Sequence, residues 1–278
     1  MAALFILLML ASNAEDRTLR LADGAEMAYV DRGKGSPAIV LVHCGNCRKE
    51  IWKETLDAFA GEHRVVAMDL PGYGRSPAGA RTTASIPALG ADVAALVKHL
   101  KLEKVVLVGN SLGGPVALEA AHLLGPKRVL GVVAVDTLQD VEAVWPEESW
   151  RKVLEAYEAD FVKMCDQLML GLLPKDAPEA TRQRVDDETC SNDPKVAIAL
   201  HRTFRSYEAS RALREAGVPV WAINSTQRAT AVDANRKYSP TFQVILMDGV
   251  GHYPQVEKPA EFQAHLLFVV RALQQGPR

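Results

Sequence analysis

The sequence predicts an α/β domain whose mainly parallel sheet is covered by helices on both faces. Strand-like and helical segments alternate through most of the chain, which is typical of parallel sheets with crossover helices. Several short runs contain only apolar residues, as strands buried on both faces do, and 105–108 is the clearest of them. The alternation stops between residues 137 and 214, where the sequence turns helical, acidic and loop-rich.

The chain before residue 105 is expected to supply the first strands and helices. The turn signal Asp23-Gly24 precedes a strand, and the apolar residues of 86–100 recur at helical spacing. In chain order we expect strands at 26–31, 38–42 and 64–68, and helices at 52–59 and 86–100.

The same alternation continues on both sides of the interruption. Pro115 suits the first turn of a helix that follows the strand 105–108. Further strands are expected at 129–135, 218–223 and 243–247, and further helices at 115–124, 232–238 and 259–273. Since 278 residues suit one large domain, we predict a core formed by 16–136 and 215–278, with a helical insertion at 137–214.

Composition and charge exclude several functional classes. Lys and Arg number 32 against 34 Asp and Glu, which gives a net charge of -2, and no long basic run offers a surface for phosphates. We therefore expect no nucleic-acid partner. With 48% hydrophobic and 24% charged residues, the chain is an ordinary folded protein rather than a disordered one, and its oligomeric state is left open.

Residues 1–15 have features of a secretory signal peptide. An apolar run of roughly ten residues precedes Ser12-Asn13-Ala14, which has the small-x-Ala form of a cleavage site, but no Lys or Arg precedes that run. A secreted or periplasmic location is expected; the alternative is a cytoplasmic protein whose apolar amino terminus packs on the domain. The run is too short for a bilayer, which needs about 20 apolar residues, and no other segment looks transmembrane.

The four cysteines fall into two pairs. Cys44 and Cys47 form a CxxC pair beside His43, which is compatible with redox chemistry or zinc, but no second Cys/His pair with metal-ligand spacing follows. We interpret them as small apolar residues packed under the site, and expect no metal or cofactor. Cys165 and Cys190 lie in one helical region and could pair in an exported protein.

A nucleophilic serine is predicted at Ser111. A serine hydroxyl needs an adjacent base and an exposed, sharply turned position, and Gly109-Asn110-Ser111-Leu112-Gly113 between a strand and a helix provides that turn. The helix that follows directs its amino-terminal N–H groups at developing negative charge. His252 follows the last strand and a glycine pair, where the chain order Ser, acid, His requires the base.

These motifs together resemble α/β-fold hydrolases. The resemblance rests on Val42-His43-Cys44-Gly45, the loop DLPGYGRS at 69–76, the elbow GNSLGG and the sequence GVGHY, and it extends from about residue 18 onward. It implies an eight-stranded sheet, a helical lid inserted after strand six and an oxyanion hole of backbone N–H groups. On this chain the donors would be Leu112 and either Gly45 or Cys44. Glycine usually follows the histidine in this family, and here Cys44 stands in that place.

The resemblance also implies an acid that completes a triad with Ser111 and His252. In relatives it often follows the strand that begins here at Val218, but 224–228 contain no carboxylate. Some relatives carry it after strand six, where this chain has Asp136, and Asp233 is the second candidate. A carboxylate in that role fixes the histidine tautomer and stabilises the imidazolium. Asp136 could instead cap the first helix of the lid.

The predicted function is a serine hydrolase that cleaves a carboxylic ester or related acyl compound through an acyl-enzyme intermediate. Apolar residues of the insertion are expected to cover the serine and favour a small to medium apolar substrate group. The expected substrate contacts are Cys44, Trp145, Phe161 and Met164. The alternatives are a lactone or C–C bond hydrolase on the same fold, and a receptor of low turnover.

Overall fold

The computed structural model describes residues 16–81 and 84–276. The proposed signal peptide at 1–15 therefore lies outside the described residues. Within the described ranges, no helix is long and apolar enough to cross a membrane.

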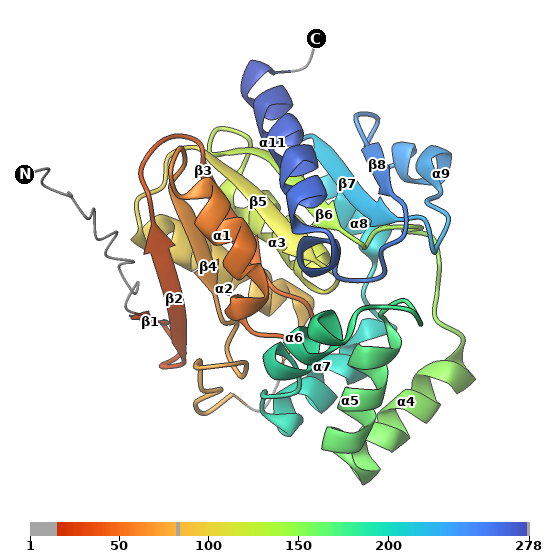
Figure 1. The fold of residues 1–278 in the computed structure, drawn as a ribbon. Coiled ribbons are helices and arrows are strands. Elements are labelled where there is room, and N and C mark those ends of the chain that lie inside the picture. The colour runs from red at the N-terminus through yellow and green to blue at the C-terminus, as the bar shows by residue number, and fades with distance from the viewer. Residues whose placement is uncertain (1–15, 82–83, 277–278) are drawn as a thin grey trace, which may run out of the picture.

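An eight-stranded sheet forms the centre of the described chain (Figure 1). Its strands lie in the order β1-β2-β4-β3-β5-β6-β7-β8. β2 pairs antiparallel with β1 and β4, and all other neighbours pair parallel, which confirms the mainly parallel sheet. The strands are β1 (Arg17–Arg20), β2 (Glu26–Arg32), β3 (Ala38–Val42), β4 (Val65–Met68), β5 (Val105–Asn110), β6 (Val129–Val135), β7 (Val220–Ser225) and β8 (Gln243–Met247).

Both faces of the central strands are buried. In β3, Val40 and Val42 pack in one hydrophobic core, whereas Ile39 and Leu41 pack in the other. Successive side chains of a strand point to opposite faces, so a strand covered on both sides has no position for a polar residue. The helices of the first face are α2 (Ile86–His99), α3 (Gly113–Leu124) and α8 (Ala209–Glu215), and those of the second are α1 (Lys53–Phe59) and α11 (Pro259–Gln275).

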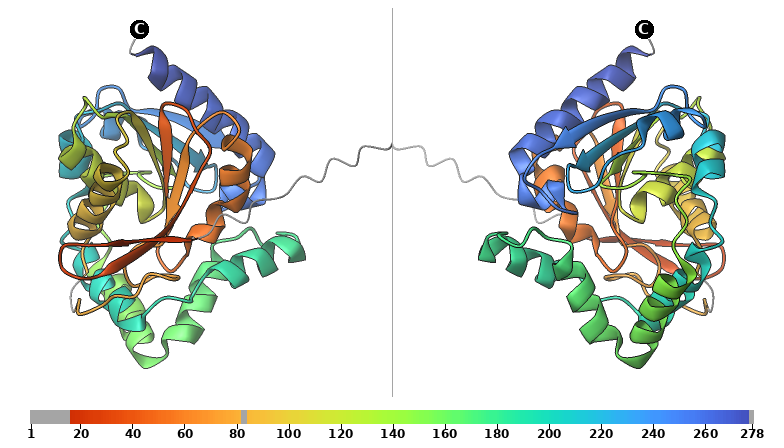
Figure 2. Two further views of the ribbon diagram at one scale, coloured as in Figure 1. Left: turned by 90° about the vertical axis from the view of Figure 1, so that its left-hand side faces the viewer. Right: turned by 90° about the vertical axis from the view of Figure 1, so that its right-hand side faces the viewer.

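The chain between β6 and β7 is helical, as expected for 137–214. Its helices are α4 (Glu147–Ala159), α5 (Phe161–Gly171), α6 (Glu179–Glu188), α7 (Pro194–Phe204) and α8. Figures 1 and 2 show α4 to α7 gathered in a separate layer below the sheet. By contrast, α8 packs on α3 of the core. The last helix of the predicted insertion therefore belongs structurally to the core.

A few elements differ from the sequence expectations. The short strand β1 was not predicted from local pattern because its sequence RTLR has little apolar alternation and is mostly exposed. The four-residue helix α10 (Pro254–Glu257) was missed, the predicted helix at 52–59 is preceded by a 3₁₀ turn at Lys49–Trp52, and the predicted helix at 232–238 is the shorter α9 (Val232–Arg236). β7 begins two residues later than predicted, after Pro219, which has no N–H to give to a ladder.

Candidate active site

Ser111 lies on a sharp turn between β5 and α3. Its φ is +52°, a left-handed conformation that is uncommon for residues other than glycine. A Cβ on Gly109 would lie 2.0 Å from the carbonyl oxygen of Gly113, and one on Gly113 would lie 2.4 Å from that of Val42. Only glycine fits these two positions. The Ser111 N–H donates to Val135 O over 3.0 Å, which ties the turn to the end of β6.

His252 and Asp136 form a hydrogen-bonded pair beside this turn. Nδ1 of His252 lies 2.7 Å from Oδ2 of Asp136, and both side chains are largely buried. The second carboxylate oxygen, Oδ1, accepts the Ser225 N–H over 2.9 Å. Asp136 directly follows β6 and, like Ser111, has a positive φ, of +43°. The alternative acid, Asp233, lies exposed on α9.

The electrostatic environment of Asp136 favours its ionised form. Burial alone would raise the pKa of the carboxyl group, but the hydrogen bonds from the His252 ring and the Ser225 N–H outweigh burial and hold that pKa below its usual value. An ionised carboxylate is an acceptor only, so the His252 nitrogen that faces it carries the proton. In the neutral form of the ring, this tautomer leaves Nε2 as the nitrogen that can accept a proton.

A second carboxylate, Glu257 of α10, holds the backbone around His252. Its Oε2 accepts the Gly251 N–H over 2.7 Å, and its Oε1 accepts the Tyr253 N–H over 2.9 Å. Burial raises the pKa of Glu257, and these two hydrogen bonds oppose that shift. Sequence reasoning missed this residue. The available signal was a carboxylate five residues after the histidine.

Asn110 connects the serine turn with the histidine loop. Its Nδ2 donates to Val135 O over 2.9 Å and to His252 O over 3.1 Å, and its Oδ1 accepts from Gln255 Nε2 over 3.2 Å. Asn110 is fully buried. In the sequence, Asn110 was interpreted only as the variable position of the elbow. In the structure, its hydrogen bonds link the turn that carries Ser111 to the backbone of His252.

The four cysteines form two disulfides. Cys44 pairs with Cys47, and Cys165 pairs with Cys190. Cys44 and Cys47 are buried, as expected of small apolar residues packed under the site, but the sequence interpretation did not include the bond between them. The physical reason is the loop between them, which brings their Cα atoms to 5.2 Å, within disulfide range. The described residues contain no free cysteine and no cluster of three or more potential metal ligands.

The loop after β3 places a backbone N–H beside the serine turn. A Cβ on Gly45 would be 3.8 Å from the side chain of Leu112, so the two loops that carry the expected oxyanion donors are neighbours. His43 stabilises the loop. Its Nε2 accepts the Leu70 N–H over 3.0 Å, and its Nδ1 lies 2.7 Å from Cys44 O. Burial lowers the pKa of His43, which favours the neutral ring that these bonds require.

The predicted substrate contacts from the insertion lie in two places. Phe161 is buried and stacks on Tyr157 with 5.4 Å between ring centroids, and Met164 packs partly buried against the hydrophobic core that contains Cys44. Trp145 lies apart, before α4, where its side chain is 50% exposed and meets the ring of His201. Phe161 and Met164 therefore belong to the same hydrophobic core as Cys44, and Trp145 contacts the His201 ring, which also meets Tyr157.

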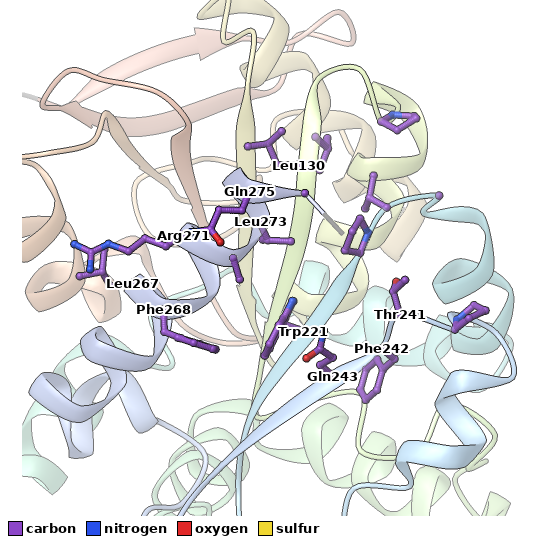
Figure 3. Close-up of a pocket in the computed structure, with 18 of the residues that line it drawn as sticks. Leu130, Trp221, Thr241, Phe242, Gln243, Leu267, Phe268, Arg271, Leu273 and Gln275 are labelled. Carbon is purple, nitrogen blue, oxygen red and sulfur yellow. The ribbon is translucent and has the colours of Figure 1, made fainter. Parts of the chain in front are cut away.

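A large groove elsewhere on the molecule is separate from this site. It has a volume of about 1120 Å³ and is lined by residues that include Leu130, Trp221, Phe242 and Phe268 (Figure 3). Its lining comes from the amino ends of β6, β7 and β8 and from α11. Ser111, Asp136 and His252 all follow carboxyl ends of parallel strands, which is where ligands bind in open α/β sheets.

The sheet order, the serine turn and the histidine–aspartate pair define an α/β hydrolase. The chain belongs to the alpha/beta hydrolase family, whose model matches residues 39–264.

Among known proteins, the chain is similar to the 2-hydroxy-6-oxo-2,4-heptadienoate hydrolase of Pseudomonas putida, with 27% identity over 274 residues, 90% of this chain and 94% of that protein. It is 27% identical over 259 residues to the dihydrolipoyllysine-residue acetyltransferase component of the acetoin cleaving system of Cupriavidus necator; the match covers 88% of this chain and only 66% of that protein. The structure of a thermophilic esterase from Thermogutta terrifontis matches with a TM-score of 0.80 at 22% identity, over 94% of this chain and 99% of that one, which shows the shared fold.

Proposed function

We propose that the chain is a serine hydrolase that cleaves a carboxylic ester or a related acyl compound through an acyl-enzyme intermediate. The observation that carries the proposal is the 2.7 Å contact between His252 and an ionised Asp136, beside a serine held at a φ of +52°. A serine becomes nucleophilic when an oriented base accepts its proton.

The proposed reaction has two acyl-transfer steps. Ser111 Oγ attacks the carbonyl carbon while Nε2 of His252 takes the hydroxyl proton, and the N–H groups of Gly45 and Leu112 stabilise the oxyanion. The tetrahedral intermediate expels the alcohol, which takes the proton from His252. Water then attacks the acyl-enzyme and gives a proton to His252. Ser111 Oγ leaves as the carboxylic acid is released and takes that proton back from His252, which regenerates the free enzyme. Asp136 orients the ring throughout, and no step uses a cofactor.

The helices of the insertion are proposed to act as a lid that supplies the apolar part of the substrate site. Phe161 and Met164 share a hydrophobic core with Cys44, next to the proposed oxyanion loop, and support a small to medium apolar acyl or alcohol group. Trp145 is retained as a proposed contact at the edge of the lid, where it is half exposed.

A series of nitrophenyl esters of increasing acyl length tests both the reaction and the substrate class. We expect turnover with a maximum at short to medium chains and a loss of turnover in Ser111→Ala. Binding of these esters without turnover by the wild type would contradict the proposal and favour the receptor of low turnover.

The similarity to the Pseudomonas putida hydrolase, over 94% of that protein, favours hydrolysis of a C–C bond as the second candidate, and lactone hydrolysis stays an alternative on the same fold. It would use the same nucleophile and base. The two candidates are separated by measuring kcat/KM on 2-hydroxy-6-oxo-2,4-heptadienoate, on lactones and on the nitrophenyl esters. The substrate class with the highest kcat/KM identifies the reaction.

An exported location is also proposed. Two disulfides among the described residues support it, because such bonds persist in oxidising compartments and are rare in the cytosol. Mass spectrometry of the protein from its own host tests this. A mature amino terminus near Glu15 is expected, whereas an intact terminus on a cytosolic protein would contradict it.

A further inference from the structure

Asn46 directly follows Gly45, the proposed oxyanion donor, and is a point where several parts of the insertion meet the core. The residue is buried and has a left-handed φ of +59°. Its side chain donates to the Tyr157 hydroxyl of α4 over 2.8 Å and accepts from Asn192 Nδ2 over 3.2 Å. Its backbone oxygen accepts the Cys190 N–H over 2.7 Å. Three residues of the insertion thus hold one residue of the loop.

The same part of the insertion also contacts the histidine loop. Cys190 is joined by a disulfide to Cys165 of α5. Near the end of that helix, Leu172 O accepts the His252 N–H over 3.2 Å, and Met169 O accepts the Tyr253 hydroxyl over 3.0 Å. A continuous path therefore runs from the proposed oxyanion loop, through the disulfide and α5, to the proposed base.

We propose that Asn46 is a positioning residue that sets the Gly45 N–H relative to Ser111 and His252, and that the Cys165–Cys190 disulfide is the strut that holds it. The inference rests on the proposed function, since it concerns the oxyanion hole of that reaction. β3 and β5 pair directly, with Val42 opposite Gly109, so the strand ends are fixed; Gly45 lies beyond the end of β3, and the insertion holds the residue that follows it. The insertion then positions groups of the proposed active site as well as covering the substrate.

The expected effect follows from how sensitive an oxyanion hole is to geometry. Losing one donor outright costs about 10² to 10³ in kcat, and a misplacement of about 1 Å costs up to about 10². Loss of the Asn46 side-chain contacts, with the Cys190 N–H bond to Asn46 O retained, should therefore misplace the Gly45 N–H and lower kcat by about 10-fold to 10². KM should change little, because the donor acts mainly on the charge of the transition state.

The test compares Asn46→Gly with Lys101→Gly. Glycine keeps the left-handed backbone accessible, so Asn46→Gly removes the side-chain tether without adding strain. Lys101 is exposed with a φ of +52°, and Lys101→Gly controls for the added backbone freedom.

A second variant, Tyr157→Phe, removes only the hydroxyl partner of Asn46, and it tests the proposal if Asn46→Gly does not fold. Tyr207→Phe, a partly buried tyrosine whose hydroxyl lies 3.5 Å from Pro115 O, is its control.

For each variant, kcat and KM are measured on the preferred ester, with competent sites counted by fluorophosphonate titration and the inhibition constant of a boronate measured in parallel. The expected result is a lower kcat per titrated site in Asn46→Gly and a smaller loss in Tyr157→Phe. The inhibition constant of the boronate should increase across the variants in proportion to the decrease in kcat/KM. Unchanged kcat per titrated site in both variants, or a loss explained wholly by fewer competent sites, overturns the inference. A wild type that neither labels nor hydrolyses acyl substrates overturns the proposed function itself.

Discussion

Nδ1 of His252 lies 2.7 Å from Oδ2 of Asp136, although 116 positions separate them in the chain. The carboxylate that contacts the histidine ring therefore follows β6, not β7. The end of β7 has a different part in the site, because the Ser225 N–H donates to Asp136 and the side chain of Asn224 accepts the Thr137 N–H. Strand β7 thus orients the carboxylate that β6 supplies.

Asp136→Asn should abolish most of the turnover. The amide would donate a hydrogen bond to Nδ1, so the His252 proton would move to Nε2 and the ring could no longer accept the serine proton. The expected loss is up to about 10⁴ in kcat, or about 5 kcal/mol of transition-state stabilisation. Steady-state kinetics on a nitrophenyl ester measure it.

Asp233→Asn is the matched control, because Asp233 lies exposed on α9. Its kcat should equal that of the wild type. The reverse pattern, an inactive Asp233→Asn with an active Asp136→Asn, contradicts the assignment of the acid.

The stability that Asp136 contributes should depend on pH in a defined direction. Its pKa in the folded chain lies below the usual 3.8, so ionisation is favoured by folding, and the contribution is present above that value. It is lost as the pH falls from roughly 5 through the folded-state pKa. Urea unfolding of wild type and Asp136→Asn should give a difference in unfolding free energy that shrinks over this range. A difference that grows on acidification has the wrong sign for this account.

Glu257→Gln should weaken the histidine loop. The carboxylate uses both oxygens as acceptors, from Gly251 and Tyr253, and glutamine offers only one acceptor and sets an N–H₂ group against the other N–H. The expected loss is about 1 to 3 kcal/mol of unfolding free energy, measured by urea denaturation, together with a lower kcat. Glu261→Gln on the exposed side of α11 should change neither quantity, and equal behaviour of the two variants would remove the role of Glu257.

The Cys165–Cys190 disulfide should stabilise the folded chain substantially. It closes a loop across a sequence separation of 25, for which the chain-entropy model gives about 3.5 kcal/mol. Urea unfolding of the Cys165→Ser, Cys190→Ser double variant should show a loss of about that size. An unchanged unfolding free energy would mean that the bond is absent in solution, and counting free thiols in the wild type checks this directly.

Features that require a particular residue type for a single structural reason could be predicted from the sequence. Buried parallel strands need continuous apolar runs, so β3, β5 and β6 could be predicted, and the glycines around Ser111 could be recognised because a Cβ at Gly109 or Gly113 would collide with backbone. The insertion at 137–214 could be predicted because the alternation of strands and helices stops there and helical sequence takes its place.

Other features depend on long-range contacts that local pattern does not encode. Asn110 and Glu257 bond to backbone groups that folding brings close, and Asn46 bonds to side chains of the insertion, so their residue types alone gave no signal. The Cys44–Cys47 bond depends on the conformation of the loop between them. Trp145 stays a proposed substrate contact, but its place beside the ring of His201, half exposed, could not be read from the sequence.

Covalent labelling of Ser111 is the most direct test of the central claim. A fluorophosphonate probe should attach to wild type at Ser111, located by peptide mass spectrometry, and should leave Ser111→Ala unlabelled. His252→Ala should label far more slowly, because no base takes the serine proton. Labelling of Ser111→Ala at the wild-type rate, or attachment at any other residue of the wild type, would contradict the account.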